Sequence, residues 1–307
     1  MKKKKILIFV PMIGNGGVEK NLFIIANYLS NHFDKVSIIS TSREFKFKFN
    51  KNIKFITPKN KFWNKVNNRG LKILISLYLL AKELLLKRNL NVLSFQGNLY
   101  CCVLCKIFKV KIILRSNASI TGWSKGYLKK ILYYSISKMA DKIIVNSLEF
   151  QKEYKKYFNL KTNFIYNPLN KNEIIKNGKK KVNFPFYERK TLNFINIGRL
   201  VDQKNQLLIL KSFKLIAEKT NYKFKLLIIG SGENKQKLLD FININKLRSS
   251  IKLVNFQKNP FPYLKGADAF ILASIFEGLP NVLLEALTLK KLIISSDCPT
   301  GPKEILD

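Results

Sequence analysis

Short apolar runs alternate with longer amphipathic segments along most of the chain. The runs are rich in β-branched residues and lack the in–out alternation of a half-exposed strand, which predicts strands buried on both faces of a sheet. The longer segments repeat apolar residues every three or four positions, as helices do. This order predicts parallel β–α–β construction, in which a helix packs on the sheet after each strand.

The alternation occurs twice. The first half predicts strands at 5–10, 36–40, 53–56, 92–95, 111–114 and 142–146, and helices at 18–31, 65–88, 99–108, 124–138 and 148–158. The second half predicts strands at 192–197, 225–229, 251–256, 269–273 and 292–295, and helices at 206–219, 234–245, 261–264 and 281–289. The Lys- and Asn-rich stretch between them has little periodicity, which is typical of a linker.

The expected fold class is therefore α/β, with two Rossmann-like doubly wound parallel-sheet domains facing a cleft. We expect an N-terminal domain at residues 1–168, a linker at 169–190 and a C-terminal domain at 191–307. The second domain is expected to be truncated at its C-terminus, because no strand or long helix follows the last short one.

The positive charge is concentrated in the first half. Residues 191–307 hold 17 Lys and Arg against 10 Asp and Glu, so +30 of the formal +37 falls on residues 1–190. Such a field attracts polyanions: nucleic acid, anionic lipid headgroups or phosphorylated substrates. A general abundance of Lys and Asn explains part of the charge but not its asymmetry.

Cysteine usage and hydropathy exclude two classes of protein. Cys101, Cys102 and Cys105 lie in an apolar stretch expected to be a buried helix, and neither a second Cys pair nor a nearby His completes a zinc site. No stretch reaches the ~18–20 uninterrupted apolar residues of a membrane span, so the chain is not expected to cross a membrane.

Two glycine-rich turns follow predicted strands. Gly16 and Gly17 stand between the first strand and the first helix, where backbone N–H groups at a helix N-terminus can bind phosphate. Gly230 and Gly232 follow the strand at 225–229. A tight turn without a ligand explains the first set as well as a binding loop does, and it is the preferred interpretation of the second.

A third turn carries cations. Gly198 and Arg199 directly follow the strand at 192–197, and Lys204 stands five residues further on. A guanidinium and an ammonium at the end of a strand can hold a diphosphate. A solvated turn before a helix is the alternative.

The most specific pattern is a pair of glutamates eight residues apart. Glu277 follows a buried strand, and Glu285 lies inside the helix that begins near Pro280. A carboxylate accepts paired hydrogen bonds from vicinal hydroxyls, as on a ribose or hexose. The helix N-terminus between the two carboxylates can hold a phosphate.

Together these residues resemble the retaining glycosyltransferases of family 4, which have the GT-B fold. The matching motifs are Gly198-Arg199-Leu200 with Lys204, Gly230-Ser231-Gly232-Glu233, Tyr263-Leu264 with Ala267-Asp268, the glutamate pair, Ser296 to Ile305, and more thinly Gly16-Gly17-Val18-Glu19 and Arg115-Ser116-Asn117.

The resemblance implies a role for each candidate residue. Arg199 and Lys204 would neutralise the diphosphate of a nucleotide sugar, Glu277 would hold the hydroxyls of the sugar, and Glu285 the ribose. The remaining donor-binding residues would be Gly16, Gly17, Gly198, Gly230, Gly232 and Leu283. Ser116 and Asn117 would lie on the acceptor side, with Arg115 beside them as a catalytic residue.

The resemblance also implies that neither cofactor nor metal is needed, and the absence of a D-x-D motif is consistent with this. Many relatives have a catalytic-site histidine, whereas the single histidine here, His32, ends a helix and is expected at the surface. Arg115 is the better candidate for that part of the site. Front-face attack, in which the departing phosphate acts as base, would make a histidine dispensable.

The implied function is retaining transfer of a hexose or N-acetylhexosamine from a nucleotide sugar, with UDP as the expected nucleotide, to a lipid-linked or other surface-glycan acceptor in polysaccharide biosynthesis. The basic amphipathic segments 65–88 and 123–139, combined with the +30 of the first half, predict a cytoplasmic protein that is peripheral on the inner face of the membrane. An ordinary core-facing helix with a solvated lysine face explains each segment by itself equally well.

Other functions remain open. The chain could be a basic nucleic-acid-binding protein, although no helix-turn-helix or zinc-finger pattern supports this. It could also be a nucleotide-sugar epimerase, phosphorylase or hydrolase on the same scaffold, or an inactive fragment.

Overall fold

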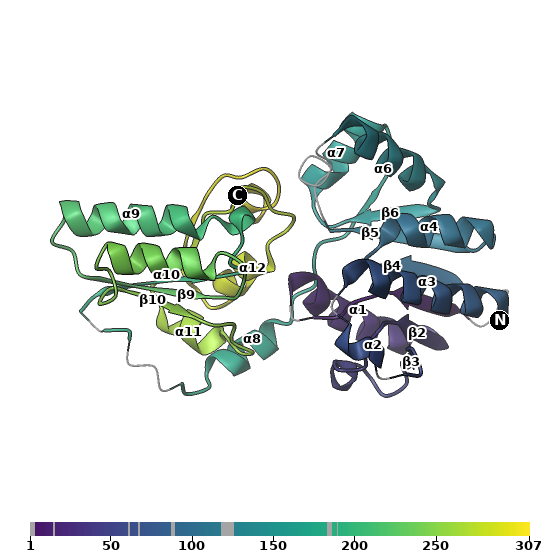
Figure 1. Ribbon diagram of the computed structural model, residues 1–307, viewed down its shortest axis with the longest axis horizontal. Helices are drawn as coiled ribbons and strands as arrows, with labels where there is room; N and C mark the ends of the chain where they lie inside the picture. Colours follow the sequence, from purple (N-terminus) through teal and green to yellow (C-terminus); the bar gives the residue numbers. More distant parts are fainter. Residues whose placement is uncertain are drawn as a thin grey trace. The chain divides into compact units, whose positions relative to one another are not determined.

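The computed structural model describes residues 4–14, 16–60, 62–66, 68–86, 90–117, 126–182, 186–188 and 190–307. The chain divides into two units, Met1–Pro168 and Leu169–Asp307, each containing one parallel sheet (Figure 1). The α/β class with two doubly wound parallel sheets is thereby confirmed.

Unit 1 has a seven-stranded sheet in the order β3-β2-β1-β4-β5-β6-β7. Its strands are β1 (Lys5–Phe9), β2 (Lys35–Ile39), β3 (Lys54–Ile56), β4 (Asn91–Ser94), β5 (Lys111–Ser116), β6 (Lys142–Val145) and β7 (Asn163–Phe164). Its helices are α1 (Gly17–His32), η1 (Lys46–Lys48), α2 (Phe62–Lys65), α3 (Arg69–Leu86), α4 (Asn98–Ile107), α6 (Tyr127–Met139) and α7 (Leu148–Phe158).

Unit 2 has a five-stranded sheet in the order β10-β9-β8-β11-β12. Its strands are β8 (Leu192–Ile197), β9 (Phe224–Ile229), β10 (Ile251–Val254), β11 (Ala269–Leu272) and β12 (Leu292–Ser295). Its helices are α8 (Lys171–Gly178), η2 (Asp202–Lys204), α9 (Gln206–Lys219), α10 (Lys235–Ile244), α11 (Phe261–Gly266), α12 (Asn281–Thr288) and α13 (Pro302–Leu306).

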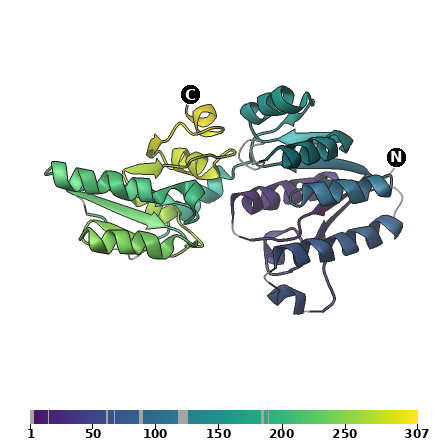
Figure 2. The ribbon, with the colours of Figure 1, turned by 45° about the horizontal axis from the view of Figure 1, so that its top comes forward.

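Alternate residues of the inner strands are buried on opposite faces of each sheet. In β1, Ile6 and Ile8 pack with residues of α1, whereas Leu7 and Phe9 pack with residues of α3 and α4. In strand β9 of unit 2, Leu226 and Ile228 pack with residues of α9 and α10, whereas Leu227 and Ile229 pack with residues of α11 and α12. Figure 2 shows helices on either side of that sheet. Burial on both faces explains why these strands are apolar without alternation.

Three local expectations differ from the structure. The segment 169–190, expected to be a linker, contains helix α8, whose Gly178 approaches Leu289 and Phe261 of unit 2. The two-residue strand β7 was not predicted, because so short a run carries no measurable periodicity. The predicted helix at 65–88 begins only at Arg69, and its last two residues lie outside the described ranges.

The sequence predicted that the cysteine helix α4 is buried, but only one side of it is. Cys101, Cys102 and Cys105 are fully buried and unpaired by disulfides, as expected. On the opposite side of the same helix, however, Tyr100 and Ile107 are 59% and 68% exposed. The apolar residues of α4 therefore serve two surfaces, one of which does not face the sheet.

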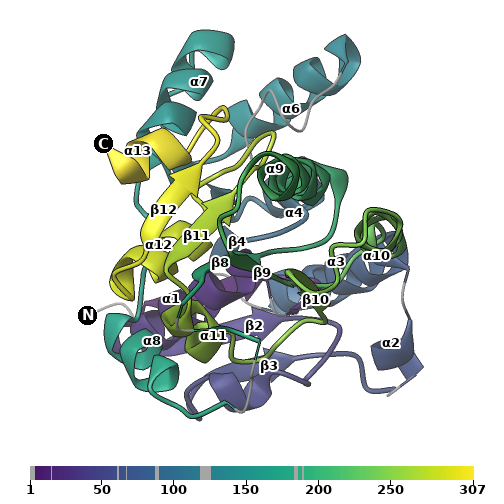
Figure 3. The ribbon, with the colours of Figure 1, turned by 90° about the vertical axis from the view of Figure 1, so that its left-hand side faces the viewer.

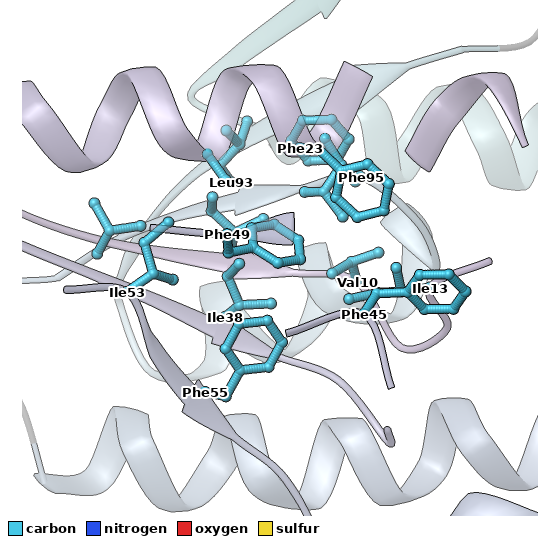
Figure 4. Close-up of a cluster of buried hydrophobic side chains, with 14 of the residues drawn as sticks. Val10, Ile13, Phe23, Ile38, Phe45, Phe49, Ile53, Phe55, Leu93 and Phe95 are labelled. Atoms are coloured by element: carbon cyan, nitrogen blue, oxygen red, sulfur yellow. The ribbon is translucent and has the colours of Figure 1, made fainter. Parts of the chain in front are cut away.

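Aromatic side chains fill the core between α1 and the first strands of unit 1 (Figure 4). The ring of Phe49 meets Phe23 and Phe55 edge-to-face, with 5.1 Å between centroids in each pair. Phe47, two residues earlier, is 78% exposed. The loop around η1 thus alternates between a core residue and a solvent-facing residue of the same type.

We expect Phe49→Ala to lower the free energy of unfolding of unit 1 by about 3–5 kcal/mol, because it leaves a cavity between two rings. Urea denaturation followed by circular dichroism measures the change. Phe47→Ala is the matched control and should stay within about 0.5 kcal/mol of the wild type. Equal effects of the two substitutions would contradict the packing described above.

Candidate functional site

The strand order of unit 2 creates one position where neighbouring loops diverge. The chain runs outward from β8 through β9 to β10 and then returns to β11, which pairs with the other side of β8. Ligands of doubly wound sheets bind at such a switch point, outside the carboxyl ends of the strands. We therefore expect a ligand site in the loops that follow β8 and β11.

Two predicted site residues from these loops meet in an ion pair. Lys204, at the end of η2 after β8, contacts Oε1 of Glu277 in the loop after β11 through its Nζ atom. Ser274 Oγ donates to the same carboxylate oxygen at 2.6 Å. The side chains of Lys204 and Glu277 are only 16% and 7% exposed, so water screens their attraction weakly.

Backbone contacts fix the two loops against each other. Ile275 N donates to Gln203 O at 2.9 Å, and Gln203 Nε2 donates to Phe276 O at 2.8 Å. From a third side, Thr300 Oγ1 donates to Glu277 O. The carboxylate is thus held by a rigid frame, as a group that positions a substrate must be.

Arg199 supplies a second cation in the loop after β8. Its guanidinium is exposed, and Nη2 donates to Gln203 Oε1 at 3.4 Å, a long hydrogen bond. Gln206 Nε2 holds the Arg199 carbonyl at 2.9 Å, which fixes the backbone while the guanidinium stays accessible. This loop of unit 2 can therefore present a positive group to an anion.

The glycines of unit 2 have structural reasons to be glycine. A Cβ atom on Gly230 would lie 1.9 Å from Gly198 O, and one on Gly232 would lie 2.3 Å from Leu200 O. The loop after β9 consequently packs directly on the backbone after β8. A role of Gly198, Gly230 or Gly232 in donor binding stays a prediction.

Helix α12 buries both of its predicted donor-binding residues. Glu285 is 3% exposed, and Leu283 is fully buried in the cluster around Leu227 and Phe270. The backbone N–H of Leu283 donates to Pro280 O at 3.0 Å. The side chain of Leu283 is therefore part of the core, and its predicted part in donor binding is untested.

In unit 1 the predicted turn between β1 and α1 is present. Gly16 is the N-cap residue of α1, and Gly17 is its first residue. A Cβ atom on Gly16 would lie 2.6 Å from Glu19 Oε2, and Gln96 Nε2 in the loop after β4 donates to Glu19 Oε1 at 3.2 Å. Strands β1 and β4 flank the switch point of this sheet, so Glu19 and Gln96 join the predicted glycines there.

Arg115, at the end of β5, is buried without a carboxylate partner among the described residues. It is 3% exposed, its Nη2 donates to Asn167 Oδ1 at 2.9 Å, and its guanidinium lies 5.8 Å from the ring centroid of Phe95. Asn146 Nδ2 reaches the same Asn167 oxygen at 3.4 Å. Burial lowers the pKa of Arg115 from 12.5 to about 10.

This cluster leaves polar atoms unsatisfied. Arg115 Nε and Asn146 Oδ1 are buried and lack a hydrogen-bond partner within the described part of the chain. A buried cation surrounded by neutral amides is unfavourable for folding, which is typical of a group kept for binding. Such a cluster suits an anionic or hydroxyl-bearing ligand.

The two residues after Arg115 differ in their surroundings. Ser116 is 3% exposed, and its Oγ lies 3.3 Å from the Tyr133 hydroxyl, which in turn lies 2.7 Å from that of Tyr154. Asn117 is half-buried, and its Oδ1 has no partner among the described atoms. His32 is exposed at the end of α1, where the sequence placed it.

Sequence reasoning missed Ser274 in unit 2, and Asn146, Asn167 and Gln96 in unit 1, and it named Glu19 in a motif without giving it a role. The four missed residues stand within a few residues of a strand end, and that position was the available signal. The described residues contain no group of three His, Cys, Asp or Glu side chains arranged to hold a metal ion. Nor does any helix in the described ranges combine the length and apolarity needed to cross a bilayer.

Comparison with known proteins finds a family match in the second half of the chain, relatives by sequence, and solved structures of similar fold. Residues 173–307 match the family described as glycosyl transferases group 1. An uncharacterized glycosyltransferase of Methanocaldococcus jannaschii is 38% identical over 217 residues, which are 66% of this chain and 53% of that protein. The chain therefore spans about half the length of this relative.

A second relative aligns with nearly the whole chain. The N-acetylgalactosamine-N,N'-diacetylbacillosaminyl-diphospho-undecaprenol 4-alpha-N-acetylgalactosaminyltransferase of Campylobacter jejuni is 27% identical over 98% of this chain and 83% of its own length. Among solved structures, Anabaena HepE in complex with UDP and glucose has a TM-score of 0.77 at 15% identity, covering 99% of this chain and 83% of that chain. The glycosyltransferase resemblance and the GT-B fold expected from the sequence are confirmed.

We expect Lys204→Met to lower the free energy of unfolding of unit 2 by about 3–5 kcal/mol, because it leaves the Glu277 carboxylate buried without its cation. The double variant Lys204→Met/Glu277→Gln should recover at least about 1 kcal/mol of this loss. Urea unfolding of the three chains measures both changes.

The exposed pair of Lys214 and Glu218, 3.5 Å apart, is the control. Lys214→Met should change stability by less than about 0.5 kcal/mol. A double variant at 204 and 277 that is less stable than Lys204→Met alone would contradict the ion pair.

We expect Arg115→Met to leave the melting temperature of unit 1 unchanged or raise it by a few degrees, roughly the effect of 1 kcal/mol. The substitution removes a buried charge and keeps an unbranched chain against Phe95. Differential scanning calorimetry checks this, with Asn167→Ala as the comparison that leaves the guanidinium unpaired and should lower stability. A marked fall in the melting temperature of Arg115→Met would show that Arg115 supports the fold.

Proposed function

Since residues 173–307 match the family of glycosyl transferases group 1, we propose that the chain transfers a hexose or N-acetylhexosamine from a nucleotide sugar to a glycan acceptor. The observation that carries the proposal is the buried contact between Lys204 and Glu277 at the switch point of unit 2, with the exposed guanidinium of Arg199 in the same loop. It combines cations for a diphosphate with a fixed carboxylate for hydroxyl groups.

In the proposed reaction, the bond between the anomeric carbon and the diphosphate breaks while the acceptor oxygen bonds to that carbon on the same face. The departing phosphate takes the proton of the acceptor hydroxyl. Arg199 and Lys204 stabilise the negative charge that develops on the leaving diphosphate. Because these cations supply the neutralisation, we propose that no metal ion is required.

Glu277 is proposed to accept hydrogen bonds from hydroxyls of the donor sugar. Its carboxylate already accepts from Ser274 and Lys204 through Oε1, and this fixed orientation favours directional contacts to a substrate. Glu285 is proposed to hold the ribose. In unit 1, the Arg115 cluster with Ser116 and Asn117 is proposed to serve the acceptor.

We propose UDP as the nucleotide and a lipid-linked glycan as the acceptor. HepE, which has the same fold, was solved with UDP and glucose, and the Campylobacter relative is named for transfer to a diphospho-undecaprenol acceptor. Both points support the proposal by similarity. An acceptor of this kind lies in a membrane, so we also propose that the protein works as a peripheral protein on its cytoplasmic face.

We expect Glu277→Gln to lower kcat/KM for sugar transfer by about 10²–10³-fold, because the neutral amide loses charge-assisted hydrogen bonds to the sugar. The assay incubates the protein with membranes and a panel of radiolabelled UDP- and GDP-sugars and follows label into the lipid fraction. Net transfer to lipid also separates a transferase from an epimerase.

Glu218→Gln serves as the control, because Glu218 is an exposed glutamate of unit 2 that also pairs with a lysine. It should leave kcat/KM unchanged. If Glu277→Gln transferred sugar as fast as the wild type while remaining folded, the role given to Glu277 would be wrong.

A further inference from the structure

Three neighbouring helices of unit 1 cover one face of its sheet. Helix α4 lies between α3 and α6, and the three appear in this order in Figures 1 and 3. Their inner residues, among them Leu80, Cys105 and Ile136, belong to one buried cluster with β1, β4 and β5. The inner sides of these helices therefore cover this face of the sheet.

The outer sides of the same helices are also apolar. Apolar side chains between 37% and 81% exposed include Leu71, Leu74, Tyr78 and Leu85 on α3, Tyr100, Val103 and Ile107 on α4, and Leu128, Leu132 and Met139 on α6. We call these ten residues the outer face.

The outer face follows helical spacing. On α4 its residues are three and four positions apart. On α3, Lys82 lies four residues after Tyr78 and three before Leu85, so it continues the same spacing with a charged residue. Residues three or four apart lie on one side of a helix. Each helix therefore has a second apolar stripe, although covering a sheet requires only one.

The charges on the three helices are almost all positive. The helices carry Arg69, Lys72, Lys82, Lys106, Lys129, Lys130 and Lys138, of which Lys106 pairs with Asp141 at 2.8 Å and Lys130 lies over the ring of Tyr157. Their one acidic residue, Glu83, is 9% exposed and lies on the buried side. Long lysine side chains beside exposed leucines can keep their ammonium groups at the level of lipid headgroups while the leucines enter the acyl region.

We infer that α3, α4 and α6 form one docking face that inserts apolar side chains into an anionic bilayer. A nucleic-acid partner would explain the lysines, but it would not explain the exposed apolar side chains of Leu74, Ile107 and Leu128. A second copy of the chain would bury the leucines but would bring two lysine-rich surfaces together. A bilayer containing anionic lipids satisfies both features.

The role given to the docking face, which is to bring the protein to a lipid-linked acceptor, rests on the proposed function. The apolar stripes and the lysines are features of unit 1 whatever reaction the chain performs. The docking face and the catalytic proposal can therefore fail separately.

The test measures partitioning of the full chain onto phosphatidylcholine vesicles with and without phosphatidylglycerol. The apolar variant Leu74→Gln/Ile107→Gln/Leu128→Gln changes one exposed residue on each helix. We expect it to lower the partition coefficient onto the anionic vesicles by at least about tenfold. Leu208→Gln/Leu215→Gln/Ile244→Gln, on exposed sites of α9 and α10, is the matched control and should stay within about twofold of the wild type.

A charge variant separates insertion from electrostatic attraction. Lys82→Gln/Lys129→Gln/Lys130→Gln should weaken binding at low salt and flatten its salt dependence, because each lysine interacts with anionic headgroups over about one Debye length. All variants change exposed or half-exposed side chains, so their melting temperatures should match the wild type, which calorimetry confirms before the vesicle assay.

Several outcomes would overturn the docking face: no binding of the wild type to anionic vesicles, unchanged binding of the apolar variant, or equal loss in the control. Light scattering without lipid that found a wild-type dimer and a monomeric apolar variant would assign the face to a second copy instead. Transfer to an acceptor in detergent should persist in the apolar variant. Absence of transfer in every chain with vesicle binding intact would reject the proposed function and keep the docking face.

Discussion

Parallel strand order is the constraint on which both candidate sites depend. When all strands of a sheet point the same way, their carboxyl ends share one edge, and every connection returns across a face. In unit 2 this brings the loops after β8 and β11 together, although Lys204 and Glu277 are 73 residues apart. In unit 1 it gathers Phe95, Arg115, Asn146 and Asn167 at the ends of successive strands.

The two units treat buried charge differently. Unit 2 pairs its cation with a carboxylate and adds the Ser274 hydroxyl, so the pair is neutral and its geometry is fixed. Unit 1 surrounds Arg115 with asparagines and an aromatic ring, and the cation keeps a depressed pKa of about 10. A neutral pair can exchange partners with a substrate, whereas an uncompensated cation gains stability when an anion arrives.

The outer sides of helices α3, α4 and α6 form a distinct surface of unit 1. Helices that cover the sheet with their inner sides leave a lysine-rich apolar surface outside, on residues that have no part in the core. Glu83, the acidic residue among them, is turned away from that surface. In the proposed function, such a surface would bring the protein to a lipid-linked acceptor that stays in the bilayer.

The sequence by itself predicted the two-sheet α/β architecture, the resemblance to glycosyltransferases and the candidate residues Arg199, Lys204, Glu277 and Arg115, because periodicity and motifs are local properties. Only the tertiary structure decided which of these residues meet. The partnership of Lys204 with Glu277, the support from Ser274, and the asparagines around Arg115 depend on strand order, which no local pattern encodes. Likewise, periodicity marked α4 as apolar but could not tell a stripe facing the sheet from one facing solvent, since both have the same spacing and differ only in what packs against them.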